Sequence, residues 1–281
     1  MSSCGFSDRQ IGELVRMPVS ADVFSQNLRE LPAFRALLRA VEARLYSDIE
    51  LPARTLDLGC GDGHFVSTAF YHPLDVGIDS NFNSVRVAYG KTGVYRGVFQ
   101  AGCGRLPFGD QAFGSAICNS VLEHIPDLEG ALHDIGRVLL TGAPFVFTVP
   151  SEFFCGFLSI SRGLSDLGLR SMARAYERFF NRISRHYHYH SLEEWSVLLE
   201  DAGFSVERYR YYFSRRALQA LEWWHYFGLP ALVSKRLTGR WILSPTAANL
   251  GLTERILRRY YEEPMPARGA YLLLVARRVS E

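Results

Sequence analysis

Seven short apolar runs, most of them separated by helix-like stretches, constrain this chain more than any other feature of its sequence. The runs are TLDLG, DVGID, GVFQA, SAICNS, FVFTVP, SVERYRYYF and AYLLLVARR, at residues 55–59, 75–79, 97–101, 115–120, 145–150, 205–213 and 270–278. Their β-branched and aromatic residues are typical of strands. Strands that alternate with helices form a parallel sheet whose ligands lie at the carboxyl ends of the strands. The sequence therefore predicts an α/β fold with helices on both faces of the sheet.

Helical periodicity surrounds these runs and suggests how the chain is organised. Residues 28–47 place apolar side chains at helical spacing and predict one amphipathic helix. SLEEWSVLLEDAGF predicts another, with Ser191 as N-cap, Glu194 completing a capping box and Gly203 just past its end. We expect a single domain over 1–281, with an N-terminal helix within 20–50 and a ligand-binding core over 51–150. The segments 151–190 and 214–266 are expected to be helical insertions on the substrate side, since long insertions in a compact sheet domain are usually functional.

The chain turns on glycines directly after the first run. Gly59, Gly61 and Gly63 allow a sharp turn and are expected to expose backbone N–H groups at the start of the next helix. A phosphate loop is excluded because the Gly-Lys-Ser/Thr ending is missing, and the third glycine comes one position early for a dinucleotide fingerprint. Asp57 and Asp62 would repel a pyrophosphate. The turn therefore favours a cationic ligand.

A ribose on that ligand would need an acidic partner at the end of the second strand. Asp79, in DVGIDSN, stands 20 positions beyond Gly59, where a carboxylate can reach two vicinal hydroxyls. The glycine turn together with Asp79 predicts a nucleoside-binding site.

These residues and three later segments resemble the class I S-adenosylmethionine-dependent methyltransferases, especially the branch that acts on small molecules and lipids. GRLPFGD (104–110) and AFGSAICNSVLEHIPD (112–127) are similar to the family's L-P-F, F-D-x-V and L-E-H-I series. GRVLLTGAPFVFTVP (136–150) is similar to its R-x-L-K-P-G-G segment. The resemblance implies a Rossmann-like, mostly parallel seven-stranded sheet with an antiparallel last strand, helical insertions that form a substrate lid, and S-adenosyl-L-methionine as cofactor.

The resemblance also implies which residues bind the cofactor. In the family the glycine turn holds the methionine part and the acidic residue matched by Asp79 binds the ribose. Gly102 stands where the family often has an aspartate for the adenine, Gly114 replaces the F-D-x-V aspartate, and LTGA (140–143) replaces K-P-G-G. Backbone N–H groups, Leu106 and Asn119 are expected to hold the adenine instead. The full expected set is Asp57, Gly59, Cys60, Gly61, Gly63, Asp79, Ser80, Gly102, Cys103, Leu106, Asn119, Ser120 and His124.

The chemistry of methyl transfer directs attention to RHYHYHS (185–191). A sulfonium loses its methyl group by in-line displacement, so a base is needed only if the acceptor is a hydroxyl. An extended segment would point His186, His188 and His190 to one face. Family members often carry a histidine here, so His188 or His190 is predicted to be the acid/base or orienting residue; the alternative is a pair of histidines satisfied at a turn. No metal is expected, because no carboxylate or cysteine clearly completes the set.

The insertion contains an aromatic and basic stretch at 221–241, LEWWHYFGLPALVSKRLTGRW. Three interpretations are open: core packing, a lid over a bulky acceptor, and peripheral contact with a membrane. Basic residues are in excess in the part of the chain that contains this stretch. Residues 205–281 carry 13 basic and 6 acidic side chains, whereas residues 1–204 carry 18 and 23. Such a bias can mark a surface that meets anions, or only solvated helix faces.

Together these features predict an enzyme that transfers a methyl group to a hydroxyl, or failing that an amine or carbon, of a small or mid-sized apolar, glycosylated or lipid-like molecule. Nucleic acid is not expected, because NSVL (119–122) stands where an N-P-P-Y tetrad would. The alternatives are a non-catalytic cofactor-binding or partner-binding protein and an NAD-dependent or nucleotide-sugar oxidoreductase. Five cysteines without a C-x-x-C pair, no signal-like N-terminus and no long apolar stretch predict a cytoplasmic protein.

Overall fold

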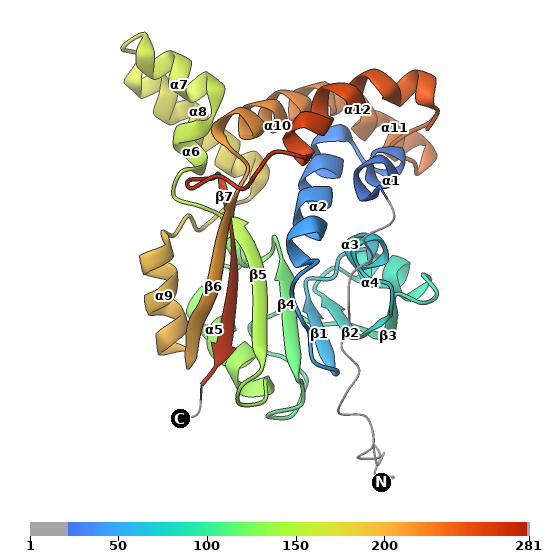
Figure 1. Cartoon of the computed structure of the whole chain (residues 1–281), viewed down its shortest axis with the longest axis vertical. Helices are drawn as coiled ribbons and strands as arrows, with labels where there is room; N and C mark the ends of the chain where they lie inside the picture. The colour runs from blue at the N-terminus through green and yellow to red at the C-terminus, as the bar shows by residue number, and fades with distance from the viewer. Residues whose placement is uncertain (1–21, 280–281) are drawn as a thin grey trace.

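The computed structural model describes residues 22–279, which form a seven-stranded sheet in the order β3-β2-β1-β4-β5-β7-β6 (Figure 1). Neighbouring strands among the first five are parallel, and β7 runs antiparallel to both β5 and β6. The strands are β1 (Thr55–Leu58), β2 (Leu74–Asp79), β3 (Tyr95–Gln100), β4 (Ser115–Asn119), β5 (Pro144–Pro150), β6 (Phe204–Tyr212) and β7 (Tyr271–Arg278). All seven predicted strands and the antiparallel last strand are confirmed.

Alternate residues of the central strands supply two separate cores. Ile117 and Val146 belong to the core on one face of the sheet, whereas their neighbours Cys118 and Phe147 belong to the other. This division follows from the two-residue period of a strand. The strands β1, β4 and β5 are buried along their whole length, as expected for parallel strands covered on both faces.

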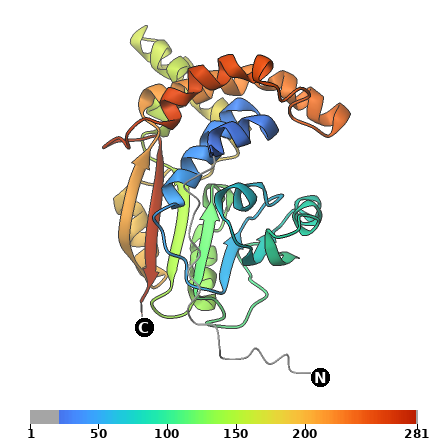
Figure 2. The ribbon, with the colours of Figure 1, turned by 45° about the vertical axis from the view of Figure 1, so that its right-hand side comes forward.

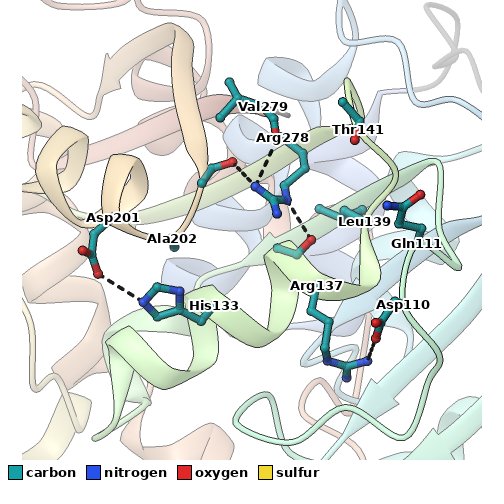
Figure 3. A pocket seen from close by; sticks show the side chains of 12 residues that line it. Asp110, Gln111, His133, Arg137, Leu139, Thr141, Asp201, Ala202, Arg278 and Val279 are labelled. Carbon is teal, nitrogen blue, oxygen red and sulfur yellow. Dashed lines mark hydrogen bonds and ion pairs between the residues drawn. The ribbon is translucent and has the colours of Figure 1, made fainter. Parts of the chain in front are cut away.

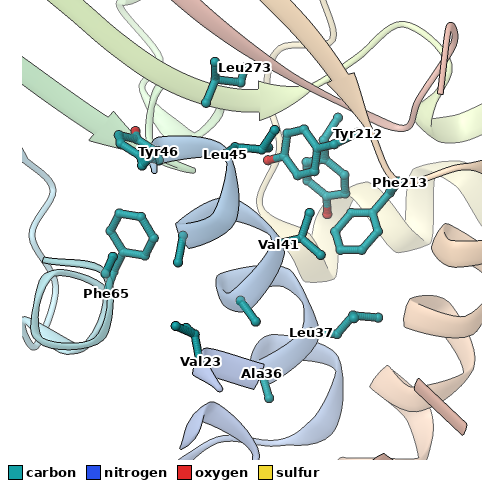
Figure 4. Packing of buried hydrophobic residues seen from close by; sticks show 14 of the residues in the cluster. Val23, Ala36, Leu37, Val41, Leu45, Tyr46, Phe65, Tyr212, Phe213 and Leu273 are labelled. Atoms are coloured by element: carbon teal, nitrogen blue, oxygen red, sulfur yellow. The ribbon is translucent and has the colours of Figure 1, made fainter. Parts of the chain in front are cut away.

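Helices cover both faces. The first core is shared with α1 (Val23–Glu30), α2 (Ala33–Tyr46) and α3 (His64–Ala69), and the second with α5 (Leu128–Val138) and α9 (Leu192–Asp201). The helix α4 (Phe82–Tyr89) packs beside β3, and the short 3-10 helix η1 (Leu122–His124) follows β4. Figure 4 shows α2 between Phe65 of α3 and the pair Tyr212 and Phe213 at the end of β6.

The N-terminal helical segment differs from the prediction. A single helix was expected over 28–47, but α1 ends at Glu30 and α2 begins at Ala33. Leu31 is extended and Pro32 is the N-cap of α2. Proline disfavours helical backbone in the residue before it and lacks the N–H that a continuous helix needs, so the chain bends here. The capping box at Ser191 and Glu194 is confirmed, and Gly203 has the positive φ of a residue just past a helix end.

The two insertions lie beyond the carboxyl ends of the parallel strands (Figures 1 and 2). The first contains α6 (Phe154–Phe157), α7 (Ser159–Asp166) and α8 (Arg170–Ser184). The second contains α10 (Arg215–Phe227), α11 (Leu229–Thr238) and α12 (Ala247–Tyr261), and it joins β6 to β7. None of the helices within residues 22–279 has the length and apolarity needed to cross a bilayer. The expectations for the N-terminal ten residues, including Cys4, lie outside the part of the chain that the structure describes.

Candidate functional site

Backbone N–H groups of the glycine turn after β1 are hydrogen-bonded to other parts of the protein. Gly59 and Cys60 both donate to the Ile78 carbonyl at 2.8 Å, and Gly61 donates to Asp79 Oδ2 at 2.9 Å. Gly63 also donates its N–H within the protein, to the Cys60 carbonyl at 3.0 Å, so the expectation that Gly59, Gly61 and Gly63 expose their N–H groups is wrong. The turn offers open space instead, because Gly61 has φ +56° and no atom beyond its immediate chain neighbours lies within 4 Å of where its Cβ would stand.

Two other glycines hold the turn in shape. Gly59 has φ +75°, and a Cβ there would lie 2.5 Å from Cγ2 of Val121, in the segment after β4. Gly63 has φ +73°, donates its N–H to the Cys60 carbonyl and serves as the N-cap of α3. Both need the left-handed conformation, and Gly59 also needs to be bare so that the chain after β4 can approach.

Asp79 ends β2 with its carboxylate against the glycine turn. Besides the Gly61 N–H, it accepts the N–H of Asn81 at 2.8 Å through Oδ1. A carboxylate can accept about four hydrogen bonds, so two positions remain. Ser80 follows directly and is exposed, and its carbonyl accepts a hydrogen bond from Gln100 at 3.1 Å.

A cavity of about 270 Å³ opens at the glycine turn. It brings together five of the predicted residues, which are Asp57, Gly59, Cys60, Gly61 and Asn119. The remaining lining residues are Leu31, Arg35, Arg39, Asp62, His64, Phe65, Ser84, Lys235 and Trp241. The cavity therefore lies between the carboxyl ends of the strands, the N-terminal helical segment and the second insertion. The other predicted residues are not part of its lining.

Basic residues on the rim of this cavity were not predicted as site residues. Arg35 and Lys235 each lie 5.8 Å from the centre of the Trp241 ring, in cation–π geometry. Arg39 lies over the Phe65 ring at 6.0 Å. The sequence contains little indication of this role. Arg35 and Arg39 resemble residues on the polar face of an amphipathic helix, and only the position of α2 over the glycine turn brings them to the cavity.

Asp57 is a buried carboxylate in the cavity wall, with 4% of its surface exposed. The Tyr95 hydroxyl donates to its Oδ2 at 2.5 Å. Burial raises the pKa of Asp57 to about 7, against the lowering effects of the Tyr95 hydrogen bond and of Arg39, while Asp79 raises it further. A cation bound in the cavity would favour the charged form of Asp57 and oppose this shift of its pKa.

A second buried carboxylate, Glu42 of α2, ties the helix to the ends of β4 and β6. It is fully buried and accepts from Arg39 Nη1 and Asn119 Nδ2 at 2.7 Å, from Ser120 Oγ at 2.8 Å and from Tyr212 Oη at 3.1 Å. Sequence analysis missed Glu42, which reads as one more charged residue on a helix. The Asn119 amide also accepts from Thr148 Oγ1 at 2.9 Å, so both ends of this side chain are engaged within the protein.

Leu106, which was expected to contact the adenine, is hydrogen-bonded to side chains of α5. Leu106 is buried, its N–H donates to Asp134, and its carbonyl accepts from Arg137 Nη2 at 3.1 Å. The N–H of Leu106 is therefore not available to a ligand. Gly102 is exposed, and Cys103 is half-buried, which raises the pKa of its thiol to about 12.

The predicted catalytic histidines pack against each other. The rings of His188 and His190 stack with centroids 5.4 Å apart, and His190 meets Trp195 edge-on at 5.4 Å. His188 Nε2 lies 2.8 Å from the Ile125 carbonyl. Burial, together with the neighbouring His188, lowers the pKa of His190, and Glu194 partly opposes this shift.

His124 and His186 form a different pair beside η1, with ring centroids 5.3 Å apart. Burial lowers the pKa of both rings, and that of His186 falls to about 3. The adjoining Glu123 is almost fully buried, which raises its pKa to about 8. At neutral pH both rings are therefore uncharged.

The aromatic stretch 221–241 has two sides. Leu221 is buried and Trp224 packs against the first core. On the other side Phe227, Val233 and Leu237 are 65%, 58% and 80% exposed. Core packing therefore accounts for only part of this stretch.

A larger cavity, of about 480 Å³, lies at the opposite end of the sheet (Figure 3). Its charged groups are already partnered: Arg137 pairs with Asp110 at 2.8 Å, His133 with Asp201 at 3.1 Å, and Arg278 donates to the Gly136 carbonyl at 3.0 Å. Ligands of parallel sheets bind at the carboxyl ends of the strands, and this cavity is not there.

Known proteins share sequence and structural features with this chain. A family model described as a methyltransferase domain matches residues 28–209, which include the glycine turn, Asp79 and the histidine segment. An S-adenosylmethionine-dependent methyltransferase of Thermotoga maritima is similar in structure, with a TM-score of 0.51, 18% identity and coverage of 87% of this chain and 90% of that one. The cyclase SpnF has a TM-score of 0.51 and 18% identity, with coverage of 88% and 82%.

A chain in the complex of the Haloferax volcanii Trm112 methyltransferase activator with a methyltransferase has a TM-score of 0.50 and 17% identity, with coverage of 87% and 90%. Identities this low show a shared fold and nothing finer. No curated protein matches the chain.

Proposed function

The chain belongs to the class I S-adenosylmethionine-dependent methyltransferases, and from this premise we propose that it methylates a hydroxyl group on a mid-sized apolar or lipid-like acceptor. One observation carries the proposal. The cavity at the glycine turn is lined on one side by Lys235 and Trp241 of the second insertion, so an acceptor that approaches from that side meets an aromatic ring and the lysine stacked on it.

The residues around the turn fit the cofactor. S-adenosylmethionine supplies a methyl group on a sulfonium, from which the leaving thioether departs neutral. Gly61 leaves open space beside the strand end, and Asp79 retains two acceptor positions for vicinal hydroxyls. Asp57 and Asp62 can receive an ammonium, while Arg35 and Arg39 can receive a carboxylate. The cavity therefore has both charges that an amino-acid group requires.

A hydroxyl acceptor must lose its proton, and we propose His190 or His188 for the acid/base or orienting role. The lowered pKa of His190 keeps its ring neutral at physiological pH, as a base requires. His188 is fastened through Nε2 to the Ile125 carbonyl, and its stacked ring holds His190 in place. An orienting role for His188 and a proton-accepting role for His190 follow from this difference.

The exposed side of 221–241 supports a lipid-like acceptor. Phe227, Val233 and Leu237 protrude into solvent beside Lys235 and Arg236, a combination typical of helices that lie at a membrane surface. Contact with an anionic bilayer through this stretch would bring a membrane-embedded acceptor to the cavity.

The test is a transfer assay with radiolabelled methyl donor and four separate acceptor pools: small hydroxylated metabolites, lipid vesicles, protein and RNA. Label in the first or second pool, together with the mass gain of one methylene unit, supports the proposal. Label only in protein or RNA overturns it. Binding of S-adenosylhomocysteine without any transfer would favour the non-catalytic alternative, and a change in NADH fluorescence on mixing would favour the oxidoreductase alternative. His133→Ala, in the cavity at the other end of the sheet, serves as the control for nonspecific loss.

A further inference from the structure

Two histidines and one glutamate converge at η1, from segments about 60 residues apart in the chain. Glu123 and His124 follow β4, and His186 lies between α8 and α9. One potential ligand atom from each of the three lies within 4.8 Å of the others. Glu123 is 2% exposed, whereas the His124 side chain is 38% exposed, so the cluster is anchored in the core and open to solvent on one side.

Hydrogen bonds at Nδ1 determine which ring nitrogen is free on each histidine. His124 Nδ1 lies 2.8 Å from the Arg185 carbonyl, which can only accept. His186 Nδ1 lies 2.7 Å from the Tyr189 hydroxyl, whose own proton is donated to Asn181 Oδ1 at 2.7 Å. Both rings therefore donate through Nδ1 and keep a lone pair on Nε2. Metal-binding histidines have this arrangement, in which the second nitrogen is held by a carbonyl or another acceptor.

Glu123 contributes a carboxyl group, one oxygen of which lacks a partner. Its Oε1 lies 3.8 Å from His124 Nε2, and its Oε2 is buried without any hydrogen bond from residues 22–279. A buried polar atom without a partner is costly, and native proteins rarely leave one unless an ion or water satisfies it. A cation between Glu123 and the two imidazoles would supply the missing partner.

Hydrogen bonds within the protein already join the segment that contains Glu123 and His124 to the segment that contains His186. The Tyr187 N–H donates to the Glu123 carbonyl at 2.8 Å, and His188 Nε2 lies 2.8 Å from the Ile125 carbonyl. With the bond from His124 to Arg185, three contacts hold the cluster in register. This fastening explains why the three histidines of 186–190 do not act as one set: His188 stacks on His190, while His186 faces His124.

We propose that Glu123, His124 and His186 bind one divalent transition-metal ion. Two imidazole nitrogens and one carboxylate oxygen form the donor set of sites that hold Zn²⁺ or Fe²⁺ and keep positions open for further ligands. Mg²⁺ and Ca²⁺ prefer oxygen ligands alone and are not expected here.

The ion would lie next to the cavity. Glu123 and His124 come shortly after Asn119, which lines the cavity. Val121, between Asn119 and Glu123, approaches Gly59 of the cavity wall. A metal-bound hydroxyl loses its proton more readily than a free one, so the ion would prepare a hydroxyl acceptor for methylation. This last consequence rests on the proposed function, whereas binding of the metal does not.

The experiment titrates the purified full-length chain, stripped with chelator, with ZnCl₂ in a calorimeter and with CoCl₂ under visible spectroscopy. One ion per chain and the absorption bands of cobalt bound to nitrogen and oxygen are expected. His186→Ala and Glu123→Gln should each weaken Zn²⁺ binding by at least about 100-fold, and Tyr189→Phe, which leaves all three ligands in place, by about 10- to 100-fold. His133→Ala removes a histidine that faces a carboxylate elsewhere, and it should bind Zn²⁺ like the unmodified chain.

Circular dichroism shows whether each variant is folded, and Tyr189→Phe tests the site if either ligand variant does not fold. Unchanged Zn²⁺ affinity in the folded variants, or no binding to the unmodified chain, would overturn the proposal. S-adenosylhomocysteine binding is measured in parallel without metal. A chain that binds Zn²⁺ but not the nucleoside would refute the proposed function and leave the metal site standing.

Discussion

The carboxylate of Asp79 offers a direct test of the cofactor site through the substitution Asp79→Asn. Each of its oxygens accepts one backbone N–H, from Gly61 at 2.9 Å and from Asn81 at 2.8 Å, and two acceptor positions remain for ribose hydroxyls. The amide keeps one acceptor oxygen and turns an NH₂ group toward the other partner. The variant therefore loses one charge-assisted hydrogen bond to the ribose and weakens the support of the glycine turn.

The magnitude follows from the loss of that bond. A hydrogen bond to a charged group contributes about 1.5–3 kcal/mol, so S-adenosylhomocysteine should bind about 10- to 150-fold more weakly to the variant. Calorimetry at one pH and salt concentration measures the dissociation constants directly. Thermal unfolding without ligand, run in parallel, separates weaker binding from loss of the fold.

A matched control lies at the other end of the same strand. Asp75 Oδ2 accepts the Thr55 N–H at 2.8 Å, so Asp75→Asn perturbs a comparable backbone contact far from the glycine turn. We expect its affinity for S-adenosylhomocysteine to equal that of the unmodified chain. If Asp79→Asn is folded and binds as tightly as Asp75→Asn, the ribose assignment is refuted.

Four further substitutions test residues in and around the site. Glu42→Gln leaves an arginine without its charged partner, and chemical denaturation should show a loss of about 3–5 kcal/mol in the free energy of unfolding. The folded pKa of Asp57, about 7, exceeds the usual aspartate value of 3.8, so the stability that its protonated form provides is complete below about pH 4 and is lost as the pH rises through 7. The loss is about 4 kcal/mol at most, at 1.36 kcal/mol per pKa unit, and Asp57→Asn should flatten this part of the stability–pH curve. Gly59→Ala should destabilise the chain more than Gly61→Ala, since the added Cβ meets Val121 only at Gly59 and both positions share the cost of a left-handed backbone, about 1–2 kcal/mol.

Each of these expectations has an outcome that contradicts it. A Glu42→Gln chain as stable as the exposed control Glu262→Gln would show that the buried network adds nothing. Parallel stability–pH curves for Asp57→Asn and the unmodified chain would remove Asp57 as the titrating group. Equal stability losses at Gly59 and Gly61, with no recovery when Val121→Ala is added to Gly59→Ala, would show that the contact with Val121 is unimportant.

Local patterns determined most of the fold. Each strand could be found from its own residues, because a strand buried on both faces reads as a short continuous apolar run and a strand buried on one face alternates apolar and polar residues. The capping box of Ser191 and Glu194 is equally local, since its hydrogen bonds join residues three apart in the chain. The left-handed backbone of the glycine turn could be predicted because glycine adopts positive φ without strain. The one break that periodicity overlooked, at Pro32, was also visible in the sequence, as the proline itself.

The charged and polar partners of the site were decided by the tertiary structure. Glu42 is surrounded by donors from α2, the end of β4 and the end of β6, and Glu123 and His186 meet only because the chain returns to the end of β4 after α8. A charged residue on a helix looks the same in sequence whether it faces water or a buried partner, because periodicity reports which face is apolar and not what lies opposite. The glycine turn and Asp79 thus identified the cofactor family from sequence alone. The cations beside the turn and the cluster beside η1 required the packing of distant segments against the sheet.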